Sequence, residues 1–248
     1  MRNISETDLT IVMPCYNENS RGVFKDRLNK LIQYMYEQTN LVYELILVND
    51  GSTDDTLKVM QEFSSQYLNI RVVTYFPNVG KSYAVKKGLE IAEGRVSLML
   101  DADLSIPLSN ISKFYTYSIK YNVIVGVRQR EEVNRGIVRN TISKLSHTAT
   151  RLLLGIKIKD TQCGFKMFDT QLIQSVLPYV KSKRWLIDIE LILYTQAHKT
   201  TKIKEVSLVD NQILQSTLRS KEALKSSIKE LFIILANKHN TIASIKNK

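Results

Sequence analysis

The chain has 248 residues, of which 44% are hydrophobic and 24% charged, and its formal net charge is +11. This composition is that of an ordinary globular protein, and it excludes the disordered and collagen-like classes. The positive charge favours an anionic partner, but the charge alone does not separate nucleic acid, an anionic membrane surface and a phosphorylated substrate.

The chain carries no apolar run near the about 20 residues that are needed to cross a bilayer. Its first residues, MRNISETDLT, lack the apolar core of a signal peptide. We therefore expect a cytoplasmic protein that is either free or peripheral on the cytoplasmic face of a membrane. Cys15 and Cys163 stand in unrelated contexts without a metal-type spacing, which indicates two reduced thiols.

Short runs rich in Val, Ile and Leu alternate with segments of helical periodicity, which is the pattern of a parallel sheet covered by helices. We expect a single α/β domain over residues 1–220, followed by an amphipathic basic helix and tail over residues 221–248. In that last helix, Ile228 and Phe232 belong to the expected apolar face, and lysines occupy another face. The expected strands are 9–13, 45–49, 70–75, 96–100 and 123–127, and the expected later helices are 139–154 and 221–236.

Each of the first four strands is followed by a polar loop, PCYNEN, NDGSTDDT, FPNVGKSY and DADLSIP in turn. The carboxyl ends of parallel strands meet at one edge of a sheet, and ligands bind there. We expect Asp50 to accept a hydrogen bond from a nucleotide base or ribose, with an ordinary strand-to-helix turn as the alternative. Gly80 and Lys81 open a helix at which backbone N–H groups can meet a phosphate, although the full phosphate-loop spacing is missing.

Asp101 and Asp103 follow the fourth strand and are separated by one residue. Two carboxylates this close repel each other unless a positive charge lies between them. Hard oxygen ligands on one short turn suit Mg²⁺ or Mn²⁺, which take further ligands from the phosphates of a substrate. A plain polar turn is the alternative, but three other polar loops share the same edge. The pair therefore predicts a metal site that bridges a diphosphate.

Taken in order, PCYNEN, LILVNDGSTDDT, NVGKSYAVKKG and LDADLS resemble the nucleotide-binding motifs of the inverting, family-two glycosyltransferases. The resemblance implies the GT-A fold, a Rossmann-like, mostly parallel sheet flanked by helices. It also implies a nucleotide-diphosphate sugar donor and a divalent metal. The later segments VGVR, KDTQCGFKMF and KRWLIDIEL are similar to the dolichyl-phosphate glucosyltransferase and mannosyltransferase branch, and most of all to its glucosyl side.

The resemblance assigns roles to residues by their position in these motifs. The nucleotide would be lined by Pro14, Tyr16, Glu18, Asp50, Gly80 and Lys81, and the metal and diphosphate would be held by Asp101 and Asp103. The lipid phosphate would be met by Arg128, Arg139 and Ser143. The sugar and acceptor pocket would be shaped by Asp160, Gln162, Cys163, Gly164, Trp185, Asp188 and Glu190.

A phosphate acceptor is ionised at neutral pH and needs no strong base, whereas a hydroxyl acceptor needs one. Asp188 and Glu190 are the candidates for that base, and a solvated helix face beside Trp185 is the alternative for this pair. We predict an inverting enzyme that moves glucose from a UDP-sugar to a polyprenyl or dolichyl phosphate.

Two other functions stay open. One is a soluble glycosyltransferase acting on a hydroxyl of a glycan, a protein or a cell-wall polymer, and the other is a non-catalytic protein that binds sugar nucleotides. A nucleic-acid partner is not expected, because the chain has no recognisable nucleic-acid-binding motif.

Overall fold

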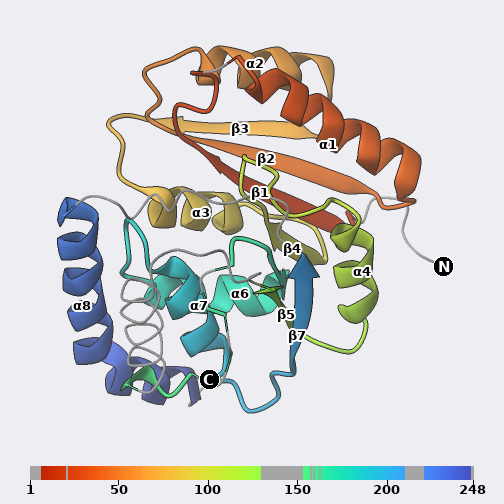
Figure 1. Cartoon of the computed structure of the whole chain (residues 1–248). Coiled ribbons are helices and arrows are strands. Elements are labelled where there is room, and N and C mark those ends of the chain that lie inside the picture. The colour runs from red at the N-terminus through yellow and green to blue at the C-terminus, as the bar shows by residue number, and fades with distance from the viewer. Residues whose placement is uncertain are drawn as a thin grey trace.

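The computed structural model describes residues 7–20, 22–129, 153–156, 158, 160–161, 163–209 and 221–246. Within these residues the strands form one seven-stranded sheet in the order β3-β2-β1-β4-β6-β5-β7 (Figure 1). β6 runs antiparallel to both of its neighbours, and all other neighbouring pairs are parallel. The strands are β1 (Leu9–Cys15), β2 (Tyr43–Asp50), β3 (Ile70–Tyr75), β4 (Val96–Met99), β5 (Val123–Gln129), β6 (Lys166–Asp169) and β7 (Ile203–Val209).

Helices cover both faces of the sheet, because successive side chains of a strand point to opposite faces. Ile11 and Met13 of β1 pack with α1, α2 and α4, whereas Val12 packs with the helices of the other face. Strands that are buried on both faces read as nearly continuous apolar runs, as these strands do. The helices are α1 (Phe24–Gln38), α2 (Thr56–Gln66), α3 (Lys81–Glu90), α4 (Asn110–Tyr117), α6 (Thr170–Val176), η1 (Leu177–Tyr179), α7 (Ile187–Thr195) and α8 (Lys221–Lys246).

The predicted α/β architecture is confirmed, and all five predicted strands are present with small differences at their ends. β1, β2, β3 and β4 are parallel, so the four polar loops that follow them leave the same edge of the sheet. β6 and β7 were not predicted from the sequence. β6 has only four residues, and β7 contains Lys204 and Glu205 within its apolar run, so neither gives a strong strand signal.

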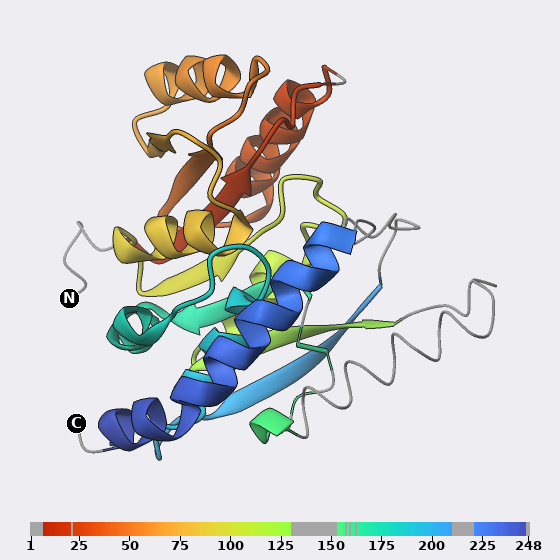
Figure 2. The same ribbon diagram turned by 90° about the vertical axis from the view of Figure 1, so that its left-hand side faces the viewer.

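The last helix, α8, begins as predicted at Lys221 but continues to Lys246. Figure 2 shows it crossing the part of the molecule that contains α7, against which it packs. The predicted apolar face was wrong in part, since Ile228 is 47% and Phe232 is 68% exposed. The packed face instead buries Glu230, Ile234 and Ile245.

None of the helices in the described part of the chain combines the length and the apolar character that a membrane span requires. The predicted helix 139–154 lies almost entirely outside the described residues.

Candidate active site

The loop after β4 places Asp101 and Asp103 beside a small open cavity of about 50 Å³. The Asp103 carboxylate accepts a hydrogen bond of 3.0 Å from the backbone N–H of Ser105, which fixes the turn. A space of this size holds an ion with its water but not a sugar nucleotide, so a donor must extend from it across the edge of the sheet. The cavity is lined by Leu100, Asp101, Asp103, Ser105, Ile106, Arg128, Cys163, Gly164 and Phe165.

Lys81, the first residue of α3, places its ammonium group 2.6 Å from the Asp101 carboxylate. Both side chains are about one third exposed, at 31% and 35%. Burial works against the charged form of Lys81, but the attraction of Asp101 and of other carboxylates leaves its pKa above the usual value. Lys81 is therefore a cation at neutral pH and balances one of the two aspartates.

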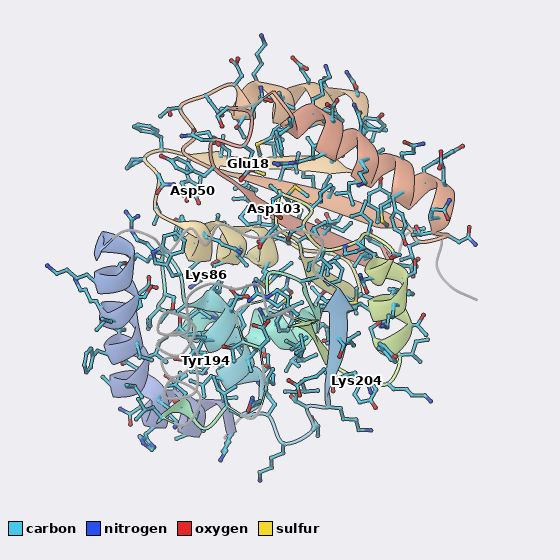
Figure 3. The ribbon with its side chains drawn as sticks, viewed as in Figure 1. Glu18, Asp50, Lys86, Asp103, Tyr194 and Lys204 are labelled. Carbon is cyan, nitrogen blue, oxygen red and sulfur yellow. The ribbon has the colours of Figure 1, made fainter. Side chains whose placement is uncertain are left out.

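Glu18, in the loop after β1, adds a third carboxylate to this edge, near Asp103 in Figure 3. The pKa of Glu18 is raised to about 7, mainly by burial and to a smaller extent by the negative charges of Asp103 and Asp101. Arg27 opposes the shift through an ion pair of 3.3 Å. Glu18, Asp101 and Asp103 thus bring three carboxyl groups to this edge of the sheet, and oxygen ligands of this kind suit a divalent cation.

The pKa of Glu18 predicts a pH-dependent loss of stability. The folded protein holds the proton more tightly than the unfolded chain, so this contribution is fully present below the ordinary pKa of 4.5 and is lost as pH rises through about 7. We expect the wild type to lose stability relative to the Glu18→Gln variant between about pH 5 and about pH 8. Urea unfolding of both proteins across this range measures the difference, and a constant difference would contradict the raised pKa.

Asp50, at the end of β2, is 3% exposed, and its carboxylate is bonded to the loop after β3. It accepts hydrogen bonds from the backbone N–H groups of Val79 and Gly80 and from the side-chain amide of Asn78, at 2.8 to 3.2 Å. The sequence had suggested a bond to a nucleotide base or ribose. In this structure Asp50 orders the loop that leads into Lys81, and its contact with a nucleotide stays a prediction.

The start of α3 differs from the phosphate site expected there. The N–H groups of Ser82 and Tyr83 donate to the carbonyl groups of Arg184 and Lys183, at 3.2 and 2.9 Å, and the N–H of Gly80 is used by Asp50. These donors are therefore not available to an anion, and the expectation of a phosphate held by the helix N-terminus is wrong for them. The positive group offered here is the Lys81 side chain.

Beneath this edge lies a buried ion pair between Lys166 of β6 and Asp188 of α7. The Lys166 side chain is fully buried and the Asp188 side chain is 7% exposed, with 2.5 Å between the ammonium nitrogen and a carboxylate oxygen. Lys166 also donates to the carbonyl group of Cys163. Asp188 adds to the negative potential at Lys81. A row of alternating charges therefore runs from Lys166 through Asp188 and Lys81 to Asp101.

Gly164 packs directly against the Asp101 carboxylate, so that a Cβ atom at this position would overlap it. The neighbouring Cys163 is fully buried, and burial is the main cause that raises the pKa of its thiol to about 11. Cys163 is thus a neutral thiol at physiological pH, and Gly164 allows the close approach between the turn before β6 and the loop after β4.

The structure corrects the interpretation of Glu190 as a catalytic base. Its side chain is fully buried, and its carboxylate accepts hydrogen bonds from the backbone N–H groups of Lys181 and Ser182 and from the Tyr194 hydroxyl. The alternative of a solvated helix face is wrong as well, because every residue of α7 is buried. Glu190 is committed to the segment before α7 and has no access to an acceptor.

A comparison with known protein families agrees with the function expected of the loops at this edge of the sheet. The model described as "Glycosyl transferase family 2" matches residues 10–177, which contain the loops after β1 to β4 and the turn before β6. The chain is a family 2 glycosyltransferase. The predicted family is therefore confirmed.

Three relatives of this glycosyltransferase share the name dolichyl-phosphate beta-glucosyltransferase. A dolichyl-phosphate beta-glucosyltransferase of Trichomonas vaginalis is 30% identical over 232 residues, covering 89% of this chain and 71% of the relative. The protein of that name from Saccharomyces cerevisiae is 32% identical, covering 82% of this chain and 66% of the relative. The one from Homo sapiens is 28% identical, covering 77% and 64%.

Solved structures support the GT-A fold that the sequence predicted for this glycosyltransferase. Glucosyl-3-phosphoglycerate synthase from Mycobacterium tuberculosis, in complex with uridine diphosphate, gives a TM-score of 0.62 at 18% identity, covering 97% of this chain and 80% of the other. S. aureus TarS, residues 1–349, gives 0.59 at 17% identity, covering 96% of this chain and 70% of the other. At these identities the likeness shows the fold alone.

The remaining predicted residues of the glycosyltransferase fall into two groups. Arg128 lines the cavity and is held by Asp160 through two parallel bonds of 2.9 and 3.2 Å. Pro14 is partly buried near the end of β1, Tyr16 beyond it is 47% exposed, and Trp185 packs partly buried against the core that contains α7. The second group lies outside the described residues and consists of Arg139, Ser143 and Gln162.

Sequence reasoning missed two charged residues that shape this glycosyltransferase, Lys166 and Glu230. Lys166 stands in the apolar run GFKMF, and a lysine in such a run is a signal of a buried, paired charge. Glu230 lies on α8 and bonds to the segment before α7. No local pattern in the sequence points to that contact.

Proposed function

We propose that this glycosyltransferase transfers glucose from UDP-glucose to a dolichyl or other polyprenyl phosphate, with a divalent cation, Mg²⁺ or Mn²⁺, held by Asp101 and Asp103. The observation that carries the proposal is the shared name of its relatives, together with the position of Arg128 beside Asp101 and Asp103 on one cavity.

The carboxylates fit a divalent cation that is completed by a substrate. Within the described residues, no group of three or more His, Cys, Asp or Glu side chains is arranged to hold a metal ion. A pair of aspartates is enough when phosphate oxygens and water supply the other ligands, as Mg²⁺ sites commonly do. A structural neighbour, the glucosyl-3-phosphoglycerate synthase, is solved with Mn²⁺ and UDP-glucose. The donor diphosphate would lie at Asp101 and Asp103, with Lys81 adding positive charge.

The two candidate bases support a phosphate acceptor over a hydroxyl acceptor. Asp188 is paired with Lys166, and Glu190 is bonded to the backbone before α7. Neither carboxylate is placed to take a proton from an acceptor hydroxyl. A phosphate needs no such step, because it is already ionised at neutral pH.

In the proposed reaction an oxygen of the acceptor phosphate attacks the anomeric carbon of glucose. The bond from that carbon to the diphosphate breaks, and its electron pair leaves with the nucleoside diphosphate. When bound, the divalent cation neutralises the charge that builds on this leaving group. Arg128, fixed by Asp160, orients the acceptor phosphate, and Lys81 stabilises the developing negative charge from the side of Asp101.

Transfer from radiolabelled UDP- and GDP-sugars to a short polyprenyl phosphate tests the proposal. The assay is run with Mg²⁺, with Mn²⁺ and with a chelator, and the unphosphorylated polyprenol serves as the matched acceptor control. We expect label in the organic phase only with UDP-glucose, a divalent cation and the phosphorylated acceptor. Equal transfer to the polyprenol would overturn the phosphate acceptor, and release of free glucose without transfer would overturn the lipid acceptor.

The exposed face of α8 supports contact with a membrane that carries such a lipid. Lys225 and Lys229 are exposed beside Ile228 and Phe232, which combines cationic and apolar side chains on one helix. We propose that this face touches an anionic bilayer. Co-sedimentation with vesicles that contain anionic lipid should fall when Phe232 and Ile228 are both replaced by serine, with the fold unchanged by circular dichroism. Unchanged co-sedimentation would contradict this contact.

The contact between Gly164 and Asp101 predicts the effect of a single added methyl group. In the Gly164→Ala variant the new Cβ atom must displace the Asp101 carboxylate. We expect the affinity for UDP with Mn²⁺ to fall about tenfold or more, the scale known for residues that orient metal ligands. Calorimetric titration measures it.

Gly155→Ala is the control, because a Cβ there meets only the side chain of Lys238, at 3.8 Å, so that only the local strain of its positive φ remains. Wild-type affinity in Gly164→Ala would show that Asp101 does not need its present position.

A further inference from the structure

The carboxylate of Glu230 on α8 is hydrogen-bonded to the backbone of residues 183–186, the turn that precedes α7 in the chain. Glu230 accepts hydrogen bonds from four consecutive N–H groups, those of Lys183 and Arg184 at 2.8 and 2.7 Å and those of Trp185 and Leu186 at 3.0 and 3.3 Å. Its side chain is almost completely buried. Such N–H groups at the start of a helix favour a negative charge, so a carboxylate is the suitable partner.

The same turn of backbone holds the start of α3 on its other side. The carbonyl groups of Lys183 and Arg184 accept the N–H groups of Tyr83 and Ser82, and the Ser82 hydroxyl accepts the N–H of Ile187. Each N–H group from Lys183 to Ile187 is thus bonded either to Glu230 or to Ser82 of α3. Residues 183–187 therefore connect α8 with the first turn of α3.

The turn and the start of α3 are in close contact at Gly80. Gly80, with φ of 126°, lies so close that a Cβ atom there would come within 2.7 Å of the carbonyl oxygen of Lys183 and of the Cα atom of Arg184. Lys81 follows directly and places its ammonium group on Asp101. A shift of the turn must consequently move the backbone from which Lys81 reaches the metal-binding aspartates.

We propose that Glu230 is a positioning residue of the donor site. It fixes the turn 183–186, the turn fixes the start of α3, and α3 places Lys81 against Asp101. This inference rests on the proposed function, since it takes the diphosphate of the donor to bind at Asp101 and Asp103. It assigns a role in donor binding to α8, whose other face is exposed.

The Glu230→Gln variant tests the inference with little change in shape. A glutamine side chain offers one acceptor oxygen in place of two and carries no charge, so it cannot satisfy all four N–H groups. Glu62→Gln is the matched control, because the Glu62 side chain is 38% exposed and its ion pair with Lys25 lies at the surface. Glu230→Ala, which removes the carboxylate entirely, is the second variant.

The only tryptophan of the chain, Trp185, lies in this turn and gives a direct signal. We expect its fluorescence emission to shift in both Glu230 variants, and amide exchange to become faster at Ser82 and Tyr83 as well as in the turn. We expect the affinity for UDP with Mn²⁺ to fall about tenfold or more in Glu230→Gln, as for other residues that orient a binding group. Thermal unfolding and circular dichroism show whether each variant remains folded.

The outcomes separate this inference from the proposed function. If wild-type protein does not bind UDP in a metal-dependent way, the donor site itself is wrong. If the wild type binds UDP, and Glu230→Gln binds it equally well, the inference alone is overturned. A loss of global stability with unchanged affinity and unchanged exchange at Ser82 and Tyr83 would likewise limit Glu230 to a structural role.

Discussion

Replacing Asp103 by asparagine is expected to reduce sugar transfer by about 10²- to 10³-fold, the range observed when one major electrostatic contact to a developing charge is removed. The asparagine side chain keeps an oxygen that can accept the N–H of Ser105, so the turn after β4 is preserved. What is lost is one of the two negative charges proposed to hold a divalent cation. The change therefore tests charge at this position and not folding.

Initial rates of transfer, measured over a range of Mn²⁺ concentrations, give the effect of Asp103→Asn on both the rate and the metal requirement. Asp169→Asn is the matched control, because Asp169 caps α6 by accepting the N–H of Leu172, and asparagine is an equally good cap. We expect the control to retain wild-type rates. Wild-type activity and metal dependence in Asp103→Asn would remove Asp103 from the site.

The apolar pattern of the sequence predicts the first half of the fold well, because β1 to β4 are short apolar runs that are buried on both faces. The same pattern places the four polar loops at one edge, and it places Asp101 and Asp103 there correctly. β6 escapes prediction because its four residues include Lys166 and Asp169. A short strand with charged residues looks like a loop until its partner strands are known.

The contacts of buried charged groups could not be predicted from the sequence. Asp188 and Glu190 were interpreted as candidate bases for a hydroxyl acceptor, with a solvated helix face as the alternative, whereas every residue of α7 is buried. Asp188 pairs with Lys166 of β6, Glu190 bonds to the backbone of Lys181 and Ser182 before α7, and Glu230 bonds to residues 183–186 from a different helix. Periodicity reports which residues are apolar, but it does not report which distant group pairs with a buried charge.

Removing one partner of the buried ion pair Lys166–Asp188 is expected to cause the largest loss of stability. Its side chains are 0% and 7% exposed, and removal of one partner leaves the other charge buried without compensation. Breaking a buried pair in this way costs about 3–5 kcal/mol. We expect Lys166→Met to lower the free energy of unfolding by about this amount, measured by urea denaturation at neutral pH. The exposed pair Lys25–Glu62 provides the control, since Lys25→Met should cost less than about 1 kcal/mol.

A double mutant tests whether the pair itself causes the loss. Asp188→Asn removes the charge that Lys166→Met leaves behind, so the combined variant should be more stable than the sum of the two single changes predicts. Strict additivity would contradict a direct interaction. Lys166 also holds the carbonyl group of Cys163, next to the glycine that packs on Asp101. Lys166→Met should therefore also weaken the binding of UDP with Mn²⁺. The double mutant should recover stability but not this affinity, because the Cys163 carbonyl group still lacks the hydrogen bond from Lys166.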